Sequence, residues 1–319
     1  MVVGTYGRGI YIMDDISPIR ELAKNDLSID QLLPTQSAYR FQMLQAMKSD
    51  GSSLINGRNP SYGANIDFYL SDENKKSIFI EIKNKDLEVV RKLDVKKFTK
   101  GVNRIMWDLR YEPTTIPKLR VDPDGVDWVK YNSDGWRPLR TWDLDVNAGK
   151  LGPLAVPGQY SVTLKIDGKE YSNKFEVLKD PNTIGTLTDI NDQFQFLFTL
   201  RNTINETVDL INKIENIRFD LQNNEKSSRS KKLERELYRI ESNLFDTKLT
   251  GAREDAFRNP NKIYGRLAAL GSDLTRFGSD FKPTDQQVEV YNVLSNRLIE
   301  QKKDFDKVMK NEFWYSEKK

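Results

Sequence analysis

The 319-residue sequence contains no cysteine and no histidine. Without cysteine the chain has no disulfides, thiolate nucleophiles or cysteine-ligated zinc, and its redox compartment is left open. Without histidine it has no Ser-His-Asp triad, no histidine general base and no histidine-ligated zinc. We therefore expect this chain to be non-catalytic and assign no catalytic residue.

A strong charge of one sign and long apolar runs are also missing. Lys and Arg total 50 against 47 Asp and Glu, a net charge of +3. Proteins that bind nucleic acids are usually far more basic, so we expect no nucleic-acid partner. No apolar run approaches the roughly 18 residues that indicate a membrane-spanning helix, so we expect no membrane span. Residue 1 also opens no signal peptide, because no basic region and unbroken apolar stretch follow it.

The first two-thirds of the chain has the period-two alternation of β-strands. Residues 2–13 are rich in strand-forming residues and predict a single strand. In residues 77–83, Ile78, Ile80 and Ile82 share one face. In residues 102–111, Trp107 lies on the expected core face.

A turn signal completes this pattern. Asp167-Gly168 separates two alternating runs, and this dipeptide favours a type I′ hairpin because both central residues need positive φ. Strands of this length, with turns at this spacing, predict an antiparallel immunoglobulin-like β-sandwich.

From about residue 186 the apolar period becomes helical. Apolar residues spaced three or four apart predict a long helix over 189–222, a second over 233–244 and a third from 260. A fourth opens at Thr284, where Gln287 completes a capping box. Four such stripes need apolar partners, so residues 186–319 are predicted to form an antiparallel helical bundle.

The segment 112–157 lacks periodicity and holds three of the five tryptophans. A stretch this long is usually a functional loop or an ordered excursion packed on a neighbour. Its aromatic residues could stack on sugar rings; alternatively, they pin the segment to the sandwich or to the helices. The candidate carbohydrate-binding residues are Trp128, Tyr131, Trp136 and Trp142.

The same segment offers one candidate metal site. Asp122, Asp124 and Asp127 surround Gly125, and clustered carboxylate oxygens are the ligands that calcium prefers. The spacing departs from the twelve-residue calcium loop of EF-hands and lacks its terminal glutamate, so a plain turn is the alternative. No other cofactor is indicated.

Five segments, in this order, resemble the C-terminal third of a family of large exported bacterial proteins. In that family, a sortilin-like (VPS10-like) β-propeller with BNR repeats precedes an immunoglobulin-like domain similar to that of the flagellar hook-capping protein, and a helical tail follows. The segments are "TYGRGIYIMDDISPIREL", "NPSYGANIDFYL", "GVNRIMWDLRYEP", "PGQYSVTLKIDG" and "NKIYGRLAALGSDLTRFGSDFKPTDQQVEVYNVLSNRL".

The resemblance implies a multidomain α+β chain. Residues 1–35 would be the end of a truncated propeller, its orphan closing strand and a linker; residues 36–182 the sandwich; and residues 186–319 the bundle. It also implies export, with a signal peptide upstream of residue 1.

The implied function is to support the propeller and to mediate protein interaction or oligomerisation. The implied partners are the chain's own upstream propeller or another protein chain. Such proteins are often named glycosyl hydrolase or sialidase-like, and the alternative is an accessory carbohydrate-binding module of such an enzyme, with a glycan as ligand. Exposed aromatic residues in the 128–142 loop would favour the alternative.

Overall fold

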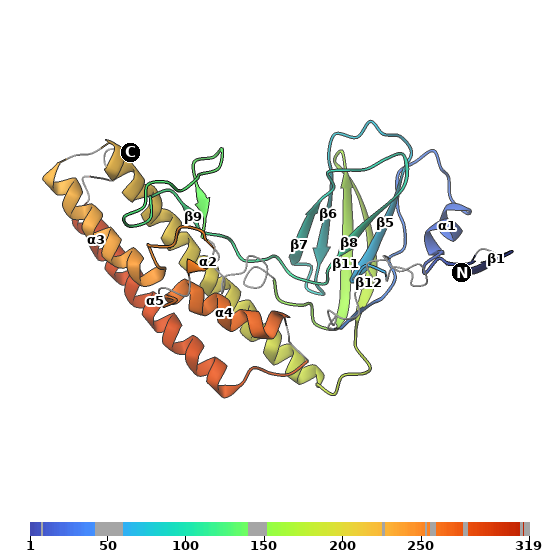
Figure 1. Cartoon of the computed structure of the whole chain (residues 1–319). Helices are drawn as coiled ribbons and strands as arrows, with labels where there is room; N and C mark the ends of the chain where they lie inside the picture. Colours follow the sequence, from blue (N-terminus) through green and yellow to red (C-terminus); the bar gives the residue numbers. More distant parts are fainter. Residues whose placement is uncertain are drawn as a thin grey trace. The chain divides into compact units, whose positions relative to one another are not determined.

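The computed structural model describes residues 1–7, 9–41, 60–139, 152–224, 227–252, 254–255, 260–276, 280–312 and 315. These residues form a mixed α and β structure with several antiparallel sheets and five helices (Figure 1). The chain divides into two compact units. We call Met1–Glu112 with Leu154–Ile184 the strand unit, and Pro113–Pro153 with Gly185–Lys319 the helical unit.

The strand unit contains a five-stranded sheet, a three-stranded sheet and a short helix. The five-stranded sheet has the order β4-β12-β11-β6-β7, antiparallel except for the parallel pair β12 and β4, and the three-stranded sheet has the order β3-β5-β8. The elements are α1 (Ser17–Leu22), β3 (Gln31–Leu32), β4 (Ala38–Arg40), β5 (Ala64–Leu70), β6 (Ile78–Lys83), β7 (Val89–Asp94), β8 (Gly101–Trp107), β11 (Gly158–Ile166) and β12 (Lys169–Lys179).

The core of the strand unit follows the predicted alternation. Ile78, Ile80 and Ile82, which were predicted to share one face, are all buried. Trp107 is fully buried, and its ring contacts those of Tyr160 and Phe175, so aromatic side chains from the two sheets meet around it. These contacts make Trp107 a core residue, as its place in the pattern predicted.

Two backbone features fix the ends of these strands. Asp167 and Gly168 both have positive φ and close the hairpin of β11 and β12, which confirms the predicted turn. Gly63, with a φ of 128°, precedes β5, and a Cβ there would lie 2.0 Å from the carbonyl oxygen of Trp107. Only glycine permits this close approach.

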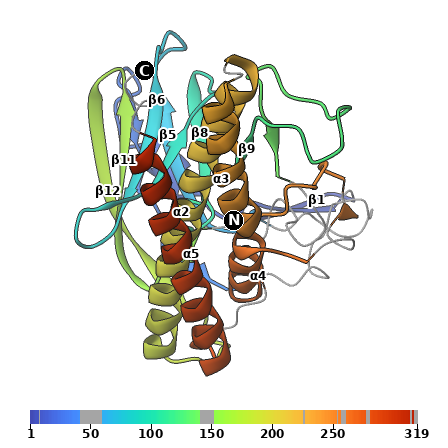
Figure 2. The same ribbon diagram turned by 90° about the vertical axis from the view of Figure 1, so that its left-hand side faces the viewer.

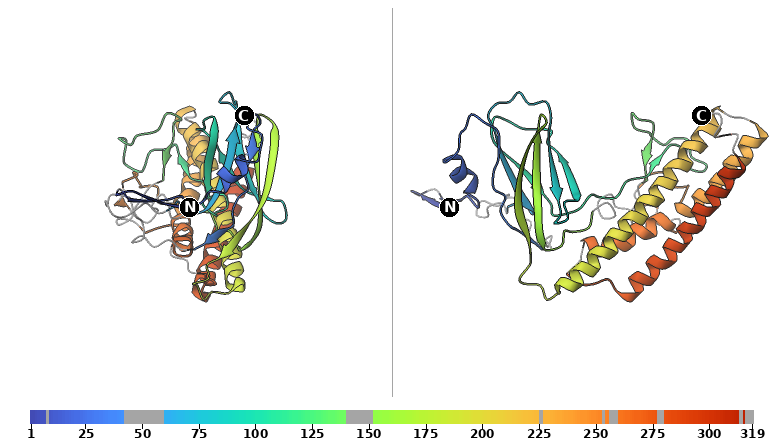
Figure 3. Two further views of the ribbon diagram at one scale, coloured as in Figure 1. Left: turned by 90° about the vertical axis from the view of Figure 1, so that its right-hand side faces the viewer. Right: turned by 180° about the vertical axis from the view of Figure 1, so that it is seen from behind.

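The single strand predicted for residues 2–13 is wrong. The structure has two strands, β1 (Val2–Thr5) and β2 (Gly9–Ile12), paired with each other as an antiparallel hairpin. Gly7 and Gly9 have φ of 75° and 127°, a conformation that lets the chain reverse here. Figure 3 shows this hairpin (dark blue, beside the N label) lying outside the two sheets.

The helical unit is built on four helices and a small strand pair. The helices are α2 (Leu187–Asn224), α3 (Ser228–Leu244), α4 (Ile263–Arg276) and α5 (Asp285–Asn311). Thr284 and Gln287 form the predicted capping box at the start of α5. Figures 1 and 2 show α2, α3 and α5 running lengthwise beside one another, with α4 packed on α2.

The segment 113–139 belongs to the helical unit, where it carries β9 (Lys118–Leu119) and β10 (Arg137–Pro138). Leu119 and Leu139 are buried in the same apolar core as the helices. The predicted division instead placed residues 36–182 in one sandwich domain. The segment belongs to the helical unit because its few apolar side chains pack into the apolar core of the helices.

None of the described helices combines the length and the apolar character needed to cross a membrane.

Candidate functional site

The candidate site is the surface of segment 113–139, which polar side chains of α2 hold in place. Asn205 accepts a hydrogen bond from the backbone N–H of Thr115 at 2.8 Å, and Asn212 accepts one from Lys118 at 2.7 Å. The two asparagines are seven residues apart, so they lie on the same face of the helix. They satisfy backbone donors that no strand partner satisfies in this short segment.

Two further residues of the segment, Arg137 and Asp124, bind α3 and the chain that follows it. Arg137 is buried and donates from Nη1 to the carbonyl oxygen of Leu249 at 2.8 Å. Asp124 accepts hydrogen bonds from the hydroxyls of Tyr238, at 2.6 Å, and Thr247, at 2.8 Å. The segment is therefore an ordered part of the helical unit.

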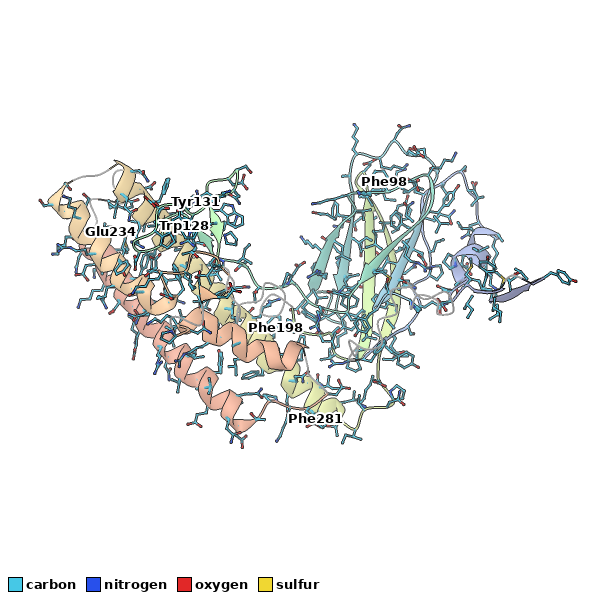
Figure 4. The ribbon with its side chains drawn as sticks, viewed as in Figure 1. Phe98, Trp128, Tyr131, Phe198, Glu234 and Phe281 are labelled. Carbon is cyan, nitrogen blue, oxygen red and sulfur yellow. The ribbon has the colours of Figure 1, made fainter. Side chains whose placement is uncertain are left out.

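The aromatic residues predicted to bind carbohydrate differ in exposure. Trp128 is 69% exposed, whereas Tyr131 and Trp136 are half-buried. Figure 4 shows Trp128 and Tyr131 on this segment of the helical unit. Lys118 Nζ lies 5.5 Å from the centre of the Trp136 ring, a cation–π contact. Burial, followed by the hydrogen bond to Asp122, raises the pKa of Tyr131 to about 12. Trp142 lies outside the described residues.

A polar pocket of about 560 Å³ lies between this segment and α2. Lys118 and Arg120 line it from the segment, and Asp209 and Asn216 line it from the helix. Lys118 therefore both lines the pocket and contacts the ring of Trp136. This arrangement offers a cation, amide and carboxylate hydrogen-bonding groups, and an aromatic ring.

The three aspartates predicted to bind calcium do not share one centre. Asp122 accepts a hydrogen bond from the Tyr131 hydroxyl at 2.6 Å, Asp124 faces Tyr238 and Thr247, and Asp127 is exposed. Among the described residues, no group of three or more metal-ligating side chains could hold an ion. The calcium site stays a prediction that this geometry does not support.

A second candidate surface is the hairpin of β1 and β2 in the strand unit. Every described residue from Met1 to Met13 is exposed. Its apolar side chains are Val2, Val3, Tyr6, Ile10, Tyr11, Ile12 and Met13, and Ile10 and Ile12 are 73% and 66% exposed. A lone two-stranded hairpin has two open edges and is marginally stable in water.

Buried charged residues that none of the sequence-based predictions included lie beneath segment 113–139. Glu215 and Arg218 lie within the apolar stripe of α2, next to Ile214 and Ile217, and Glu241 follows the buried Ile240 on α3. Charged residues inside an apolar stripe were the signal that could have identified this cluster.

The chain matches no protein-family model, no curated protein and no solved structure.

Proposed function

We propose that this chain is a non-catalytic region of an exported β-propeller protein that supports the propeller and mediates protein contacts or oligomerisation. The observation that carries the proposal is the β1–β2 hairpin, whose apolar side chains are exposed on both faces and whose edges are unpaired in the described structure. Exposed apolar surface joined to open strand edges is typical of a segment that pairs with another chain.

The proposal includes a finer description of the two units. We infer that the two sheets of the strand unit form an immunoglobulin-like sandwich, supported by the ring contacts that join them at Trp107. We also infer that α2 to α5 form an antiparallel bundle, supported by their common apolar core. In this description both units are rigid supports, and the hairpin is the element that contacts a partner.

Removing the apolar side chains of β2 tests the proposal. We expect the double variant Ile10→Thr/Ile12→Thr to self-associate at least about tenfold more weakly than the unmodified chain, because burying each isoleucine contributes about 1.5 to 3 kcal/mol. Threonine keeps the strand propensity of the hairpin. The measurement is sedimentation velocity over a concentration series, with thermal unfolding as a check on folding.

The matched control is Ile29→Thr, which removes an isoleucine that is 56% exposed outside the hairpin. It should leave association unchanged. An unmodified chain that remains monomeric at every concentration, or a control that weakens association equally, would contradict the proposed role of the hairpin.

A second function is favoured by one observation, the exposure of Trp128. An exposed indole, on an ordered segment that also carries a partly exposed Trp136 and lines a polar pocket, is the arrangement that a carbohydrate-binding surface needs. On this proposal the chain is an accessory module that binds a polysaccharide, with Lys118 favouring one that carries acidic groups.

Trp128→Ala tests this second function. If Trp128 stacks on a sugar ring, the variant should bind about tenfold more weakly to an acidic polysaccharide such as alginate, measured by affinity electrophoresis. Tyr6→Ala is the matched control, since it removes an exposed aromatic residue from the hairpin. Equal binding by Trp128→Ala and the unmodified chain, or no binding at all, would rule out this site.

A further inference from the structure

The helical unit buries a cluster of acidic side chains beneath segment 113–139. Glu215 and Arg218 come from α2, and Glu234 and Glu241 come from α3. Glu241 is completely buried, and Glu215 and Arg218 are 2% and 5% exposed. Glu215 and Glu241 are therefore two carboxyl groups inside a protein core, where an unbalanced charge is costly, and Glu234 lies partly exposed at its edge.

Arg218 is fully engaged by the two carboxyls of α3. It donates from Nε and Nη2 to Glu234 Oε1, at 3.0 and 2.7 Å, and from Nη1 to Glu241 Oε2. Glu215 has a different set of partners. Its Oε2 accepts the backbone N–H groups of Arg120, at 2.6 Å, and Val121, at 2.8 Å.

The carboxyl group of Glu215 lies close enough to that of Glu241 for a side-chain hydrogen bond between them. The second oxygen of Glu241, Oε1, is buried and has no hydrogen-bond partner. Two ionised carboxylates in contact within a core repel each other, and both have only acceptor oxygens. A proton on Glu241 Oε1 removes one charge and supplies the missing donor.

We propose that Glu215 and Glu241 share one proton, and that this proton holds the backbone of Arg120 and Val121 against the helices. When the proton leaves, two like charges face each other beneath the segment, and residues 113–139 loosen from α2. The attachment of the segment to the helices is therefore sensitive to pH. This inference does not depend on what the surface of the segment binds.

The electrostatics agree with this geometry. Burial and then the charge of Glu215 raise the pKa of Glu241 well above its usual value, despite the opposing effect of Arg218. Burial also raises the pKa of Glu215, against the two backbone N–H groups and the charges of Arg218 and Arg137. The charged and titratable groups around the pair are Arg218, Glu234, Arg137, Tyr238 and Asp124.

The sign of the pH effect follows from the raised pKa. Above the usual glutamate pKa of roughly 4.5, the unfolded chain releases the proton while the folded chain keeps it. Folding then takes up one proton, so the folded-to-unfolded ratio falls by about tenfold for each pH unit. The stabilisation is complete at acidic pH and is lost as the pH rises through the raised pKa of Glu241.

Infrared spectroscopy of the full chain tests whether the proton is present and shared. At neutral pH the unmodified chain should show the carbonyl band of a protonated carboxylic acid. Glu241→Gln should lose it, because the amide replaces the acid. Glu215→Gln should lose it too, because its amide donates to an ionised Glu241. Glu234→Gln, the matched control on the same arginine, should keep the band.

The free energy of unfolding and the hydrogen exchange of backbone amides test the shared proton independently. Between about pH 5 and pH 9, the unfolding equilibrium of Glu241→Gln should lack the one-proton dependence of the unmodified chain. Protection of the Arg120 and Val121 amides from hydrogen exchange, corrected for intrinsic rates, should fall with pH in the unmodified chain and persist in the variant.

The absence of the acid band from the unmodified chain would overturn the proposal. A band that survives in Glu215→Gln would show a buried acid that is not shared, which also overturns it. If the free energy of unfolding changed with pH in the same way for the unmodified chain and Glu241→Gln, the proposal would also be overturned. This test holds even if another variant folds too poorly for the infrared measurement.

Discussion

Replacing Trp107 with alanine is expected to lower the free energy of unfolding of the strand unit by about 3 to 5 kcal/mol. The indole is fully buried, packs on Tyr160 and Phe175, and donates from Nε1 to the carbonyl oxygen of Arg110 at 2.8 Å. The variant loses buried apolar area, leaves a cavity and removes the indole donor to the partly buried carbonyl of Arg110. Denaturant unfolding of the full chain, followed by circular dichroism, measures the loss.

Val102→Ala is the matched control, because Val102 lies on the same strand and is 48% exposed. It should change the free energy of unfolding by no more than about 0.5 kcal/mol. If Trp107→Ala cost as little as Val102→Ala, the strand unit would have a core that does not depend on this ring. That outcome would reverse the assignment of faces on β8.

The parts of the fold that the sequence predicted correctly are those governed by local periodicity. The alternation predicted that Ile78, Ile80 and Ile82 share one face, because successive side chains of a strand point to opposite sides, and all three are buried. The capping box of Thr284 and Gln287 predicted the start of α5, because both of its hydrogen bonds are made within one turn. Neither prediction needed to know what the element packs against.

The N-terminal hairpin shows where local reasoning fails. The strand-forming residues of 2–13 were identified, but the reversal depends on the φ angles of Gly7 and Gly9. Glycine is compatible with both an extended and a reversed chain, so its presence alone could not decide between one strand and two.

The placement of segment 113–139 depends on contacts between residues far apart in the sequence. Glu215 binds the backbone of Arg120 and Val121, which lie about 95 positions earlier in the chain. A backbone N–H group has no sequence signal, so no pattern in the segment indicates that a carboxylate will bind it. The sequence left open whether the segment packs on the sandwich or on the helices, and its place in the helical unit depends on those distant residues.

The second large effect is expected at Arg218, the single guanidinium that bonds both Glu234 and Glu241. Arg218→Ala should lower the free energy of unfolding of the helical unit by about 3 to 5 kcal/mol, because it leaves the buried carboxyl group of Glu241 and the partly buried one of Glu234 without their partner. Denaturant unfolding of the full chain measures this too. The transition affected should be that of the helices, whereas Trp107→Ala should affect that of the strands.

Arg239→Ala is the matched control on α3. Arg239 pairs with Asp304 at 3.0 Å, but both side chains are largely exposed, at 53% and 42%. Exposed pairs are screened by water, so the control should cost no more than about 1 kcal/mol. Equal losses from the two variants would mean that burial adds nothing to the Arg218 interaction.

The pH dependence of the Arg218→Ala effect provides a further check. Arg218 lowers the pKa of Glu241, against the larger effect of burial. Without Arg218 the folded chain binds its proton more tightly, and the pH range over which stability falls extends upward. The loss caused by Arg218→Ala should therefore be smaller at a pH where the unmodified chain keeps the proton than at a pH above the raised pKa of Glu241, because protonation of Glu241 removes the unpaired charge. A loss that stays the same while the unmodified chain releases the proton would mean that Glu241 is not the group that releases it.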